Sequence, residues 1–276
     1  MPNVDVDGLH IFVEKIGHGG PPVVLLHGFT GSNKTYRDLV YTIDRQFTTF
    51  SVDLIGHASS ASPLSVERYR MRRAVDDLAA VLRAQGFEKA VWVGYSLGGR
   101  VALNVAIHRP DVVSGLVLES ASPGLATEAE RTARVEADEA LAQRLERDGV
   151  EKFIDYWESI PLWDSQKANL NDTQKEMQRR TRLEQPRMGL ANSLRGMGTG
   201  AQDWLGDRLS ELRVPVLLVA GRLDTKFSGW AEEMAKHIPE ATLRIIENAG
   251  HNVHLEQRDE FDQVVFDFLM SVRDRL

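Results

Sequence analysis

Residues 90–106 read AVWVGYSLGGRVALNVA, and they are the strongest indication of the fold in this sequence. The apolar run at its start is typical of a buried strand, and the spacing of apolar residues at its end is typical of a helix. Between them, Ser96 lies in a Gly-x-Ser-x-Gly turn, flanked by Gly94 and Gly98. Glycines are required where a Cβ would collide with the strand or the helix. The stretch therefore predicts a nucleophile elbow, which exposes a serine hydroxyl at a helix N-terminus.

Composition and charge limit the class of protein. The chain has 276 residues, of which 42% are hydrophobic and 26% charged, and its net charge is −7. These values fit a globular protein with no general attraction to nucleic acid or to an anionic membrane. The absence of cysteine excludes disulfides and thiolate chemistry. The acidic N-terminus is unlike a signal peptide, and no apolar run reaches the roughly 18 residues of a membrane helix. We expect a cytoplasmic protein without membrane insertion.

Short apolar runs alternate with longer amphipathic stretches. The runs typical of strands are Val23–Leu26, Phe50–Val52, Ala90–Val93, Gly115–Leu118, Pro215–Ala220 and Thr242–Ile246. Short runs without in-and-out alternation favour a parallel sheet that is covered on both faces. Helical spacing is found at Val66–Gln85 and Phe261–Val272. The alternation predicts a doubly wound, mostly parallel α/β sheet.

The alternation stops in the middle of the chain, where charge is dense. The stretches with helical spacing there are Thr127–Arg147, Val150–Ser159 and Ser165–Arg182. The strand pattern resumes at Val214. We therefore expect a core formed by residues 1–122 and 208–276. Residues 123–207 are expected to form a helical cap, inserted after the sixth strand and covering the active-site end.

Two downstream residues could activate Ser96. His251 follows the last predicted strand, and Asp224 follows the strand before it. A serine hydroxyl becomes an effective nucleophile or base when a histidine takes its proton, and a carboxylate orients that histidine. The chain order Ser96, Asp224, His251 is that of α/β-hydrolases. The sequence thus predicts an α/β-hydrolase fold with this catalytic triad.

Three other residues compete for the acid and base roles. His254 is the competing histidine, and we expect its side chain to pack beside the loop. Asp53 and Glu119 also follow or end predicted strands. Because both precede the usual position of the triad acid, we interpret them as structural.

The oxyanion hole is expected to consist of two backbone N–H groups. Phe29 follows His27-Gly28 after a strand, and Leu97 directly follows Ser96. Leu97 also begins a helix, whose dipole adds to the stabilisation of negative charge. A simple tight turn at His27-Gly28 is the alternative interpretation.

Arg100 lies four residues after Ser96, so the two share a helix face. The helix dipole disfavours a cation in the first turn. An anionic substrate would explain the residue, because arginine binds carboxylates through paired hydrogen bonds. The alternative is a solvated or ion-paired surface arginine. The middle segment adds Arg131, Arg134, Arg179, Arg180, Arg182, Arg187 and Arg195, most of which must lie on solvated helix faces. This positive charge favours an anionic small molecule as the substrate.

Several motifs together resemble the 2-succinyl-6-hydroxy-2,4-cyclohexadiene-1-carboxylate synthase family of menaquinone biosynthesis. These motifs are LHGFTGS at 26–32, DLIGH at 53–57, GYSLGGR at 94–100, GLANSL at 189–194, DTKF at 224–227 and GHNVH at 250–254. The arginine after the double glycine and the DTKF run are more specific than the other core motifs. The sequence departs from the family pattern at Ala58, where glycine is usual.

The resemblance implies a lyase rather than a hydrolase. The family expels pyruvate from 2-succinyl-5-enolpyruvyl-6-hydroxy-3-cyclohexene-1-carboxylate by a 2,5-elimination. Ser96 would then act as a base on a ring proton. The three carboxylates of this substrate would account for Arg100. No cofactor or metal is expected, and the protein is expected to be a monomer or a weak homo-oligomer.

The resemblance also assigns roles by position. Arg134 and Arg182 match the family's carboxylate-binding arginines, and Arg131 is an alternative to Arg134. The remaining substrate-binding candidates are Tyr95, Trp157 and Lys226. Two other functions stay open. One is a carboxylesterase or carbon–carbon bond hydrolase with the same triad, and the other is a receptor that has lost catalysis.

Overall fold

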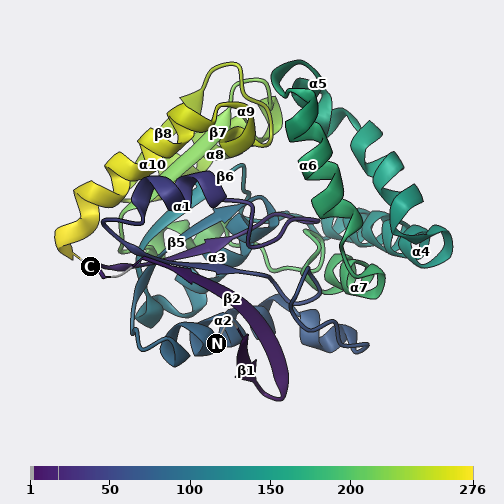
Figure 1. The fold of residues 1–276 in the computed structure, drawn as a ribbon, viewed down its shortest axis with the longest axis horizontal. Helices are drawn as coiled ribbons and strands as arrows, with labels where there is room; N and C mark the ends of the chain where they lie inside the picture. Colours follow the sequence, from purple (N-terminus) through teal and green to yellow (C-terminus); the bar gives the residue numbers. More distant parts are fainter. Residues whose placement is uncertain (1–2, 18, 276) are drawn as a thin grey trace.

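The computed structural model describes residues 3–17 and 19–275, and its centre is an eight-stranded sheet (Figure 1). The strands run in the order β1-β2-β4-β3-β5-β6-β7-β8. They are β1 (Asn3–Val6), β2 (Leu9–Ile16), β3 (Pro22–Leu26), β4 (Thr48–Val52), β5 (Ala90–Tyr95), β6 (Val113–Glu119), β7 (Val216–Gly221) and β8 (Ala241–Ile246). β2 is antiparallel to β1 and β4, whereas the pairings from β4 through β8 are parallel. The prediction of a mostly parallel sheet is confirmed.

Helices cover both faces of the sheet, so the central strands have two buried sides (Figure 1). These helices are α1 (Arg37–Ile43), α2 (Met71–Ala84), α3 (Leu97–His108), α8 (Thr225–His237) and α10 (Arg258–Val272). On β5, Trp92 packs in the core under α2, α3 and α8. Its neighbours Val91 and Val93 pack in the opposite core, with α1 and α10. Burial on both sides explains why these strands read as continuous apolar runs.

The hairpin formed by β1 and β2 is absent from the sequence-based predictions. Its turn is Asp7-Gly8, and both residues have positive φ, 50° and 79°. This backbone suits a two-residue type I′ turn, for which Asp-Gly is a preferred sequence. The burial of β1 alternates between exposed and buried residues. The Asp-Gly pair between alternating apolar residues is therefore the signal that identifies this hairpin.

Two predicted helices are interrupted in the structure. The stretch Val66–Gln85 contains a 3₁₀ turn at Val66–Tyr69 and then α2, because Arg70 between them has an extended ψ of 138°. The stretch Ser165–Arg182 is divided into α5 (Asp164–Asn169) and α6 (Asp172–Leu183).

The second interruption has a local cause. Asn171 caps α6: its side chain accepts a hydrogen bond from the backbone N–H of Gln174, whose side chain in turn accepts one from the N–H of Asn171. Such a capping box favours a new helix start at this position. The residue before it, Leu170, is extended and only 4% exposed. Burial of Leu170 and the capping box together end α5 and start α6.

The segment between β6 and β7 contains α4 (Glu128–Ser159), α5, α6 and α7 (Arg187–Met197). α4 is kinked at Gly149, which has a φ of 82°. In Figure 1 these helices form a separate layer beside the sheet, on the side of α9 (Val253–Glu256). All of them lie within residues 123–207, which is the range expected for the cap. The exact ends of that unit stay a prediction.

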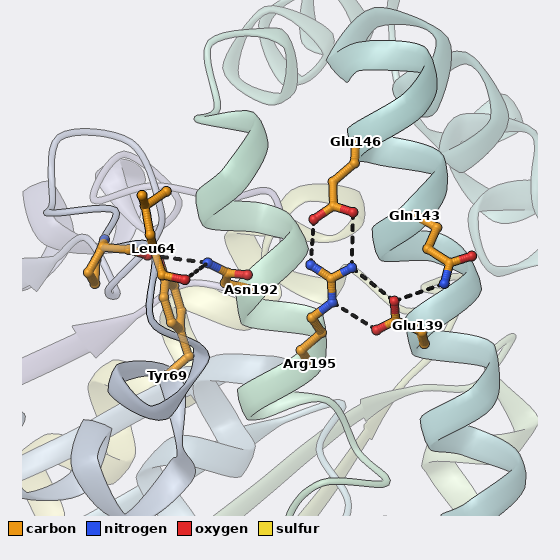
Figure 2. A network of polar contacts seen from close by, with 8 residues as sticks. Leu64, Tyr69, Glu139, Gln143, Glu146, Asn192 and Arg195 are labelled. Carbon is orange, nitrogen blue, oxygen red and sulfur yellow. Dashed lines mark hydrogen bonds and ion pairs between the residues drawn. The ribbon is translucent and has the colours of Figure 1, made fainter.

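α7 links α4 to the core (Figure 2). Arg195 on α7 donates hydrogen bonds to both carboxylate oxygens of Glu139 and of Glu146 on α4, at 2.5–3.0 Å. On the core side, Asn192 donates to the backbone carbonyls of Pro63 and Leu64, at 3.2 Å each. The ion pairs of Arg195 and the hydrogen bonds of the Asn192 side chain therefore hold α7 from opposite sides.

Among the described residues, we find no helix that combines the length and the apolar character needed to cross a membrane.

Removal of the Arg195 guanidinium should loosen the contact between α4 and α7. We expect Arg195→Met to lower the free energy of unfolding by about 1–2 kcal/mol, because several charge-assisted hydrogen bonds are lost at a partly buried position. Arg180→Met is the matched control, since the Arg180 side chain is 81% exposed and pairs with Glu184 within its own helix. Urea unfolding measures both variants. Equal effects of the two substitutions would contradict a special role for Arg195.

Candidate active site

Ser96 occupies a strained turn between β5 and α3. Its φ of 51° and ψ of −107° lie outside the regions that residues with a side chain usually adopt. A Cβ on Gly94 would overlap the backbone of Gly98, and a Cβ on Gly98 would overlap the carbonyl of Leu26 on β3. The backbone N–H of Ser96 donates to the carbonyl of Glu119, at 2.9 Å. The turn is thus enforced by close packing on both sides, as expected of an elbow.

The three predicted triad residues lie together. Nε2 of His251 is 3.0 Å from Oγ of Ser96, and Nδ1 of His251 is 2.7 Å from Oδ2 of Asp224. Because a carboxylate accepts the Nδ1 proton, Nε2 is left to accept the serine proton. His251 is 2% exposed, so its imidazole is largely shielded from bulk water. The geometry can make the serine hydroxyl basic or nucleophilic.

Each member of the relay is held in its orientation by its surroundings. Oδ1 of Asp224 accepts the N–H of Phe227 at 3.2 Å, which caps α8. The imidazole of His251 is surrounded by the rings of Phe227, Tyr95 and Trp163, whose centroids lie 4.5–5.8 Å away. This aromatic surround restricts rotation of the imidazole.

The two residues predicted to supply the oxyanion hole line the same cavity as Ser96. Leu97 is the first residue of α3, and the first N–H groups of a helix have no intrahelical acceptor. Phe29 lies in the loop after β3 and lines the same cavity as Ser96 and Leu97. His27 holds this loop in place: its Nδ1 donates a hydrogen bond to the carbonyl of Gly28 at 2.7 Å. Nε2 of His27 accepts the N–H of Leu54 at 3.0 Å.

Ser96 and His251 face a cavity of about 410 Å³ between the core and the helical segment. Its apolar wall includes the aromatic residues Phe29, Tyr95, Tyr156, Trp157, Trp163, Phe227 and Trp230. Its charged wall includes Arg100, Arg134, Lys226 and Asp138. Three of the four charged groups beside the triad are cations. The cavity therefore suits an anionic molecule with an apolar ring or chain.

Arg100 is held at the cavity wall by neutral acceptors. Its guanidinium donates to the carbonyl of Met197 at 2.8 Å and to the side-chain oxygen of Gln202 at 2.6 Å. Burial, with a smaller effect of the nearby Arg134, lowers the pKa of Arg100 to about 10. Arg100 therefore remains charged near neutral pH, and no carboxylate of the described residues is hydrogen-bonded to it.

Arg134 has a carboxylate partner that the sequence analysis missed. Its Nε donates to Oδ1 of Asp138 at 2.9 Å. Asp138 is 2% exposed, and its Oδ2 finds no hydrogen-bond partner in the part of the chain that the structure describes. The spacing of four residues on one helix is the signal that could have identified this pair.

The other predicted substrate-binding residues are divided. Trp157, Tyr95 and Lys226 line the cavity with Ser96. Arg131 does not, because its guanidinium donates to the carbonyls of Leu125 and Ala126, at 2.9 Å each. Of the two alternatives on α4, only Arg134 is brought to the cavity.

Arg182 lines a neighbouring cavity of about 390 Å³, which shares Phe29, Tyr95 and Trp163 with the first. Its guanidinium lies 4.8 Å from the centre of the Trp163 ring and donates to Glu158 at 3.1 Å. Burial lowers the pKa of Arg182. A ligand would have to extend past Tyr95 and Trp163 to contact both Ser96 and Arg182.

The residues interpreted as structural have internal partners. Asp53 accepts the backbone N–H groups of Asn33 and Ser59, at 2.5 and 3.0 Å. His254 packs beside the loop as expected, with Nδ1 2.8 Å from the carboxylate of Glu119. Among the described residues there is no cluster of histidine and carboxylate side chains that could hold a metal ion.

The fold and the relay of Ser96, His251 and Asp224 define an enzyme of the α/β-hydrolase class. The profile of the alpha/beta hydrolase fold family matches residues 21–257. A Bacillus subtilis (strain 168) protein named for 2-succinyl-6-hydroxy-2,4-cyclohexadiene-1-carboxylate synthase is 42% identical over 269 residues, which are 96% of this chain and 97% of the relative. The synthase of Serratia proteamaculans (strain 568) is 30% identical, and the match covers 91% of this chain and 94% of the relative. The chain therefore belongs to this synthase family, as its motifs predicted.

Solved structures give the same result. MenH from S. aureus superposes with a TM-score of 0.90 at 34% identity, covering 95% of this chain and 98% of the other. A malate-bound esterase from Thermogutta terrifontis superposes with a TM-score of 0.86 at 27% identity, covering 99% and 97%. The class thus includes both the synthase and hydrolases of closely similar shape.

The stability of the fold should fall in acid because of His57, which is buried beside Phe29. The ring of His57 lies 5.9 Å from that of Phe29, and burial lowers the pKa of His57 from 6.5 to about 3. Between pH 6.5 and 3, His57 is therefore protonated in the unfolded chain but neutral in the folded protein. The free energy of unfolding falls as the pH falls through this range. Between pH 7 and about pH 4.5, His57→Asn should lose about 2 kcal/mol less stability than the wild type. Urea unfolding at both pH values measures this, and equal losses in the two proteins would contradict it.

Proposed function

We propose that the protein eliminates pyruvate from 2-succinyl-5-enolpyruvyl-6-hydroxy-3-cyclohexene-1-carboxylate, giving 2-succinyl-6-hydroxy-2,4-cyclohexadiene-1-carboxylate. Ser96 is the base, and His251 and Asp224 activate it. The observation that carries the proposal is the shared cavity, in which the relay faces Arg100, Arg134 and Lys226. A neutral ester needs no such cations, whereas a substrate with three carboxylates does.

The proposed reaction requires no attack on carbon by the serine. Nε2 of His251 accepts the hydroxyl proton of Ser96 while the serine oxygen takes the proton from ring carbon 2. The electrons form the conjugated diene and break the bond from carbon 5 to the enolpyruvyl oxygen. The leaving group departs as the enolate of pyruvate and regains a proton. Every proton thus stays within the relay, the leaving group and water.

Loss of the ring proton places negative charge on the succinyl carbonyl, which is attached to the same carbon. We propose that the N–H groups of Phe29 and Leu97 stabilise this oxygen. One such donor typically contributes about 3 kcal/mol to transition-state stabilisation. The start of α3 at Leu97 supports the assignment, because a helix N-terminus favours negative charge.

Substrate binding is proposed to involve Arg100, Arg134, Lys226, Tyr95 and Trp157, which line the cavity together. Arg182 fits a carboxylate on a substituent that reaches the neighbouring cavity. We propose that residues 123–207 act as the cap that closes over this substrate. We also propose that the enzyme acts in the cytoplasm as a monomer or a weak homo-oligomer, with a small-molecule substrate and no cofactor.

The second candidate function is a serine carboxylesterase or carbon–carbon bond hydrolase. The strained elbow and the 3.0 Å bond from Ser96 to His251 serve nucleophilic attack equally well. The similarity to the Thermogutta terrifontis esterase supports keeping this candidate.

Replacement of Ser96 tests the proposed chemistry. We expect Ser96→Ala to reduce the kcat of pyruvate release by about a thousandfold or more, as losses of catalytic serines do. The thermal unfolding midpoint should stay close to that of the wild type. Hydrolysis of p-nitrophenyl acetate by the wild type is measured alongside. Near-normal pyruvate release by the variant would remove the triad from the mechanism, and fast ester hydrolysis without pyruvate release would favour the second candidate.

Two neighbouring arginines provide a matched test of the anionic substrate. Arg134 lines the cavity, whereas Arg131 does not and is hydrogen-bonded to the carbonyls of Leu125 and Ala126. We expect Arg134→Met to raise the KM for the tricarboxylate by about tenfold or more, because a charge-assisted contact is lost. Arg131→Met should leave the KM nearly unchanged. Steady-state kinetics of both variants decides this, and equal KM values would place substrate binding elsewhere.

A further inference from the structure

A buried polar cluster beneath the triad is not used by the reaction proposed above. Its centre is Glu119 at the end of β6, which is 0% exposed. β7 is the neighbouring strand, and the loop after it supplies Asp224. The two adjacent strands are thus each followed or ended by a carboxylate. Asp224 bonds to His251, and Glu119 bonds to His254, three residues further along the same loop and helix.

The carboxylate of Glu119 is contacted by three hydrogen-bond donors. Oε1 accepts the backbone N–H of His254 at 3.0 Å, and Nδ1 of His254 lies 2.8 Å from both oxygens. Oε2 accepts the hydroxyl proton of Tyr36 at 2.9 Å. A buried carboxylate is tolerated only when donors of this kind replace its hydration.

The same residue also holds the nucleophile elbow. The backbone carbonyl of Glu119 accepts the N–H of Ser96 at 2.9 Å. Glu119 therefore bonds to the serine segment through its main chain and to the histidine segment through its side chain. These two segments meet in the hydrogen bond between Ser96 and His251, which spans 155 positions of the sequence.

A ring contact reinforces this link. Tyr95, the residue before Ser96, packs against the imidazoles of His251 and His254, with centroid distances of 5.4 and 4.9 Å. Displacement of His254 would therefore disturb Tyr95 and His251 together. The first turn of α9 has N–H groups without intrahelical acceptors, and the bond from His254 to Glu119 satisfies one of them.

The loop has a second carboxylate, which provides a useful contrast. Glu256 accepts the N–H of Gly250 at 2.9 Å and that of Asn252 at 3.4 Å. These bonds shape the loop on either side of His251, but they lie within the loop and α9. Of the two carboxylates, Glu119 is the one that ties this loop to the strand beside the elbow.

We infer that Glu119 is a positioning residue that sets the distance between Ser96 and His251. Its carboxylate fixes the start of α9 through His254, and its carbonyl fixes the elbow. This rests on the proposed function only for the choice of substrate, because any reaction of Ser96 would depend on the same distance.

The test compares Glu119→Gln with Asp77→Asn. Asp77 is also a buried carboxylate, 5% exposed and bonded to Arg68, but it lies on α2 away from the triad. We expect Glu119→Gln to reduce the kcat of pyruvate release by about tenfold or more with little change in KM, since about 1.4 kcal/mol corresponds to tenfold. The rate at which a fluorophosphonate labels Ser96 should fall by the same factor. Asp77→Asn should lower the unfolding temperature but leave kcat and labelling unchanged.

Tyr36→Phe keeps the inference testable if Glu119→Gln does not fold. It removes a single donor to Oε2 and keeps the ring, and we expect labelling to slow by about two- to fivefold, as for the loss of one hydrogen bond. The inference would be overturned if the variants that fold are less stable, as Asp77→Asn is, but label Ser96 as fast as the wild type does. Slow labelling of Ser96 in the variants would uphold the role of Glu119. If the wild type released no pyruvate, that result would reject the proposed function and leave the role of Glu119 intact.

Discussion

The hydrogen bond between Ser96 and His251 is the interaction on which the rest of the site depends. It joins the end of β5 to the loop after β8, and both lie at the carboxyl edge of the same parallel sheet. Register brings these ends level: Tyr95 pairs with Glu119, Glu119 with Val219, and Gly221 with Ile246. The strained φ of Ser96 and the glycines around it then aim the hydroxyl at the imidazole. Fold and chemistry are connected through this one contact.

The second constraint is the cost of burying guanidinium groups. Arg182 is buried and bonded to Glu158, and Arg100 is partly buried and bonded to a carbonyl and an amide. Arg134, whose side chain is 40% exposed, is bonded to Asp138. Such groups are expensive to remove from water, and their cost is offset when an anion binds. Because its hydrogen-bond partners within residues 3–17 and 19–275 are neutral, the charge of Arg100 is available to a ligand. The combination of a basic serine with available cations separates the proposed lyase from an ordinary esterase.

Much of this arrangement could be predicted from the sequence. The central strands are buried on both faces and therefore read as apolar runs, and Ser96, Asp224 and His251 occur in the order that the fold requires. The hairpin at the N-terminus was missed although its Asp-Gly turn is a local signal. The break at Leu170 was missed because burial of a single side chain and a capping box override the helical spacing.

The direction of charged side chains was the least predictable feature. Arg131 and Arg134 lie three positions apart, yet Arg131 reaches back to the carbonyls of the preceding loop. Arg182 likewise stacks on Trp163 in the neighbouring cavity. The direction of Arg182 depends on a tertiary contact, and that of Arg131 depends on the path of the preceding loop. Glu119 shows the same limit, because its partners Tyr36 and His254 are distant in sequence and adjacent only in the fold.

The mass of the ring product formed by the wild-type enzyme from the enolpyruvyl substrate distinguishes elimination from hydrolysis most directly. Removal of a ring proton by Ser96 predicts a diene that has lost the whole leaving group, including its bridging oxygen. Hydrolysis would instead give a ring that keeps a hydroxyl at that carbon and is heavier by one water. We expect the mass of the diene, and the mass of the heavier alcohol would contradict elimination by Ser96.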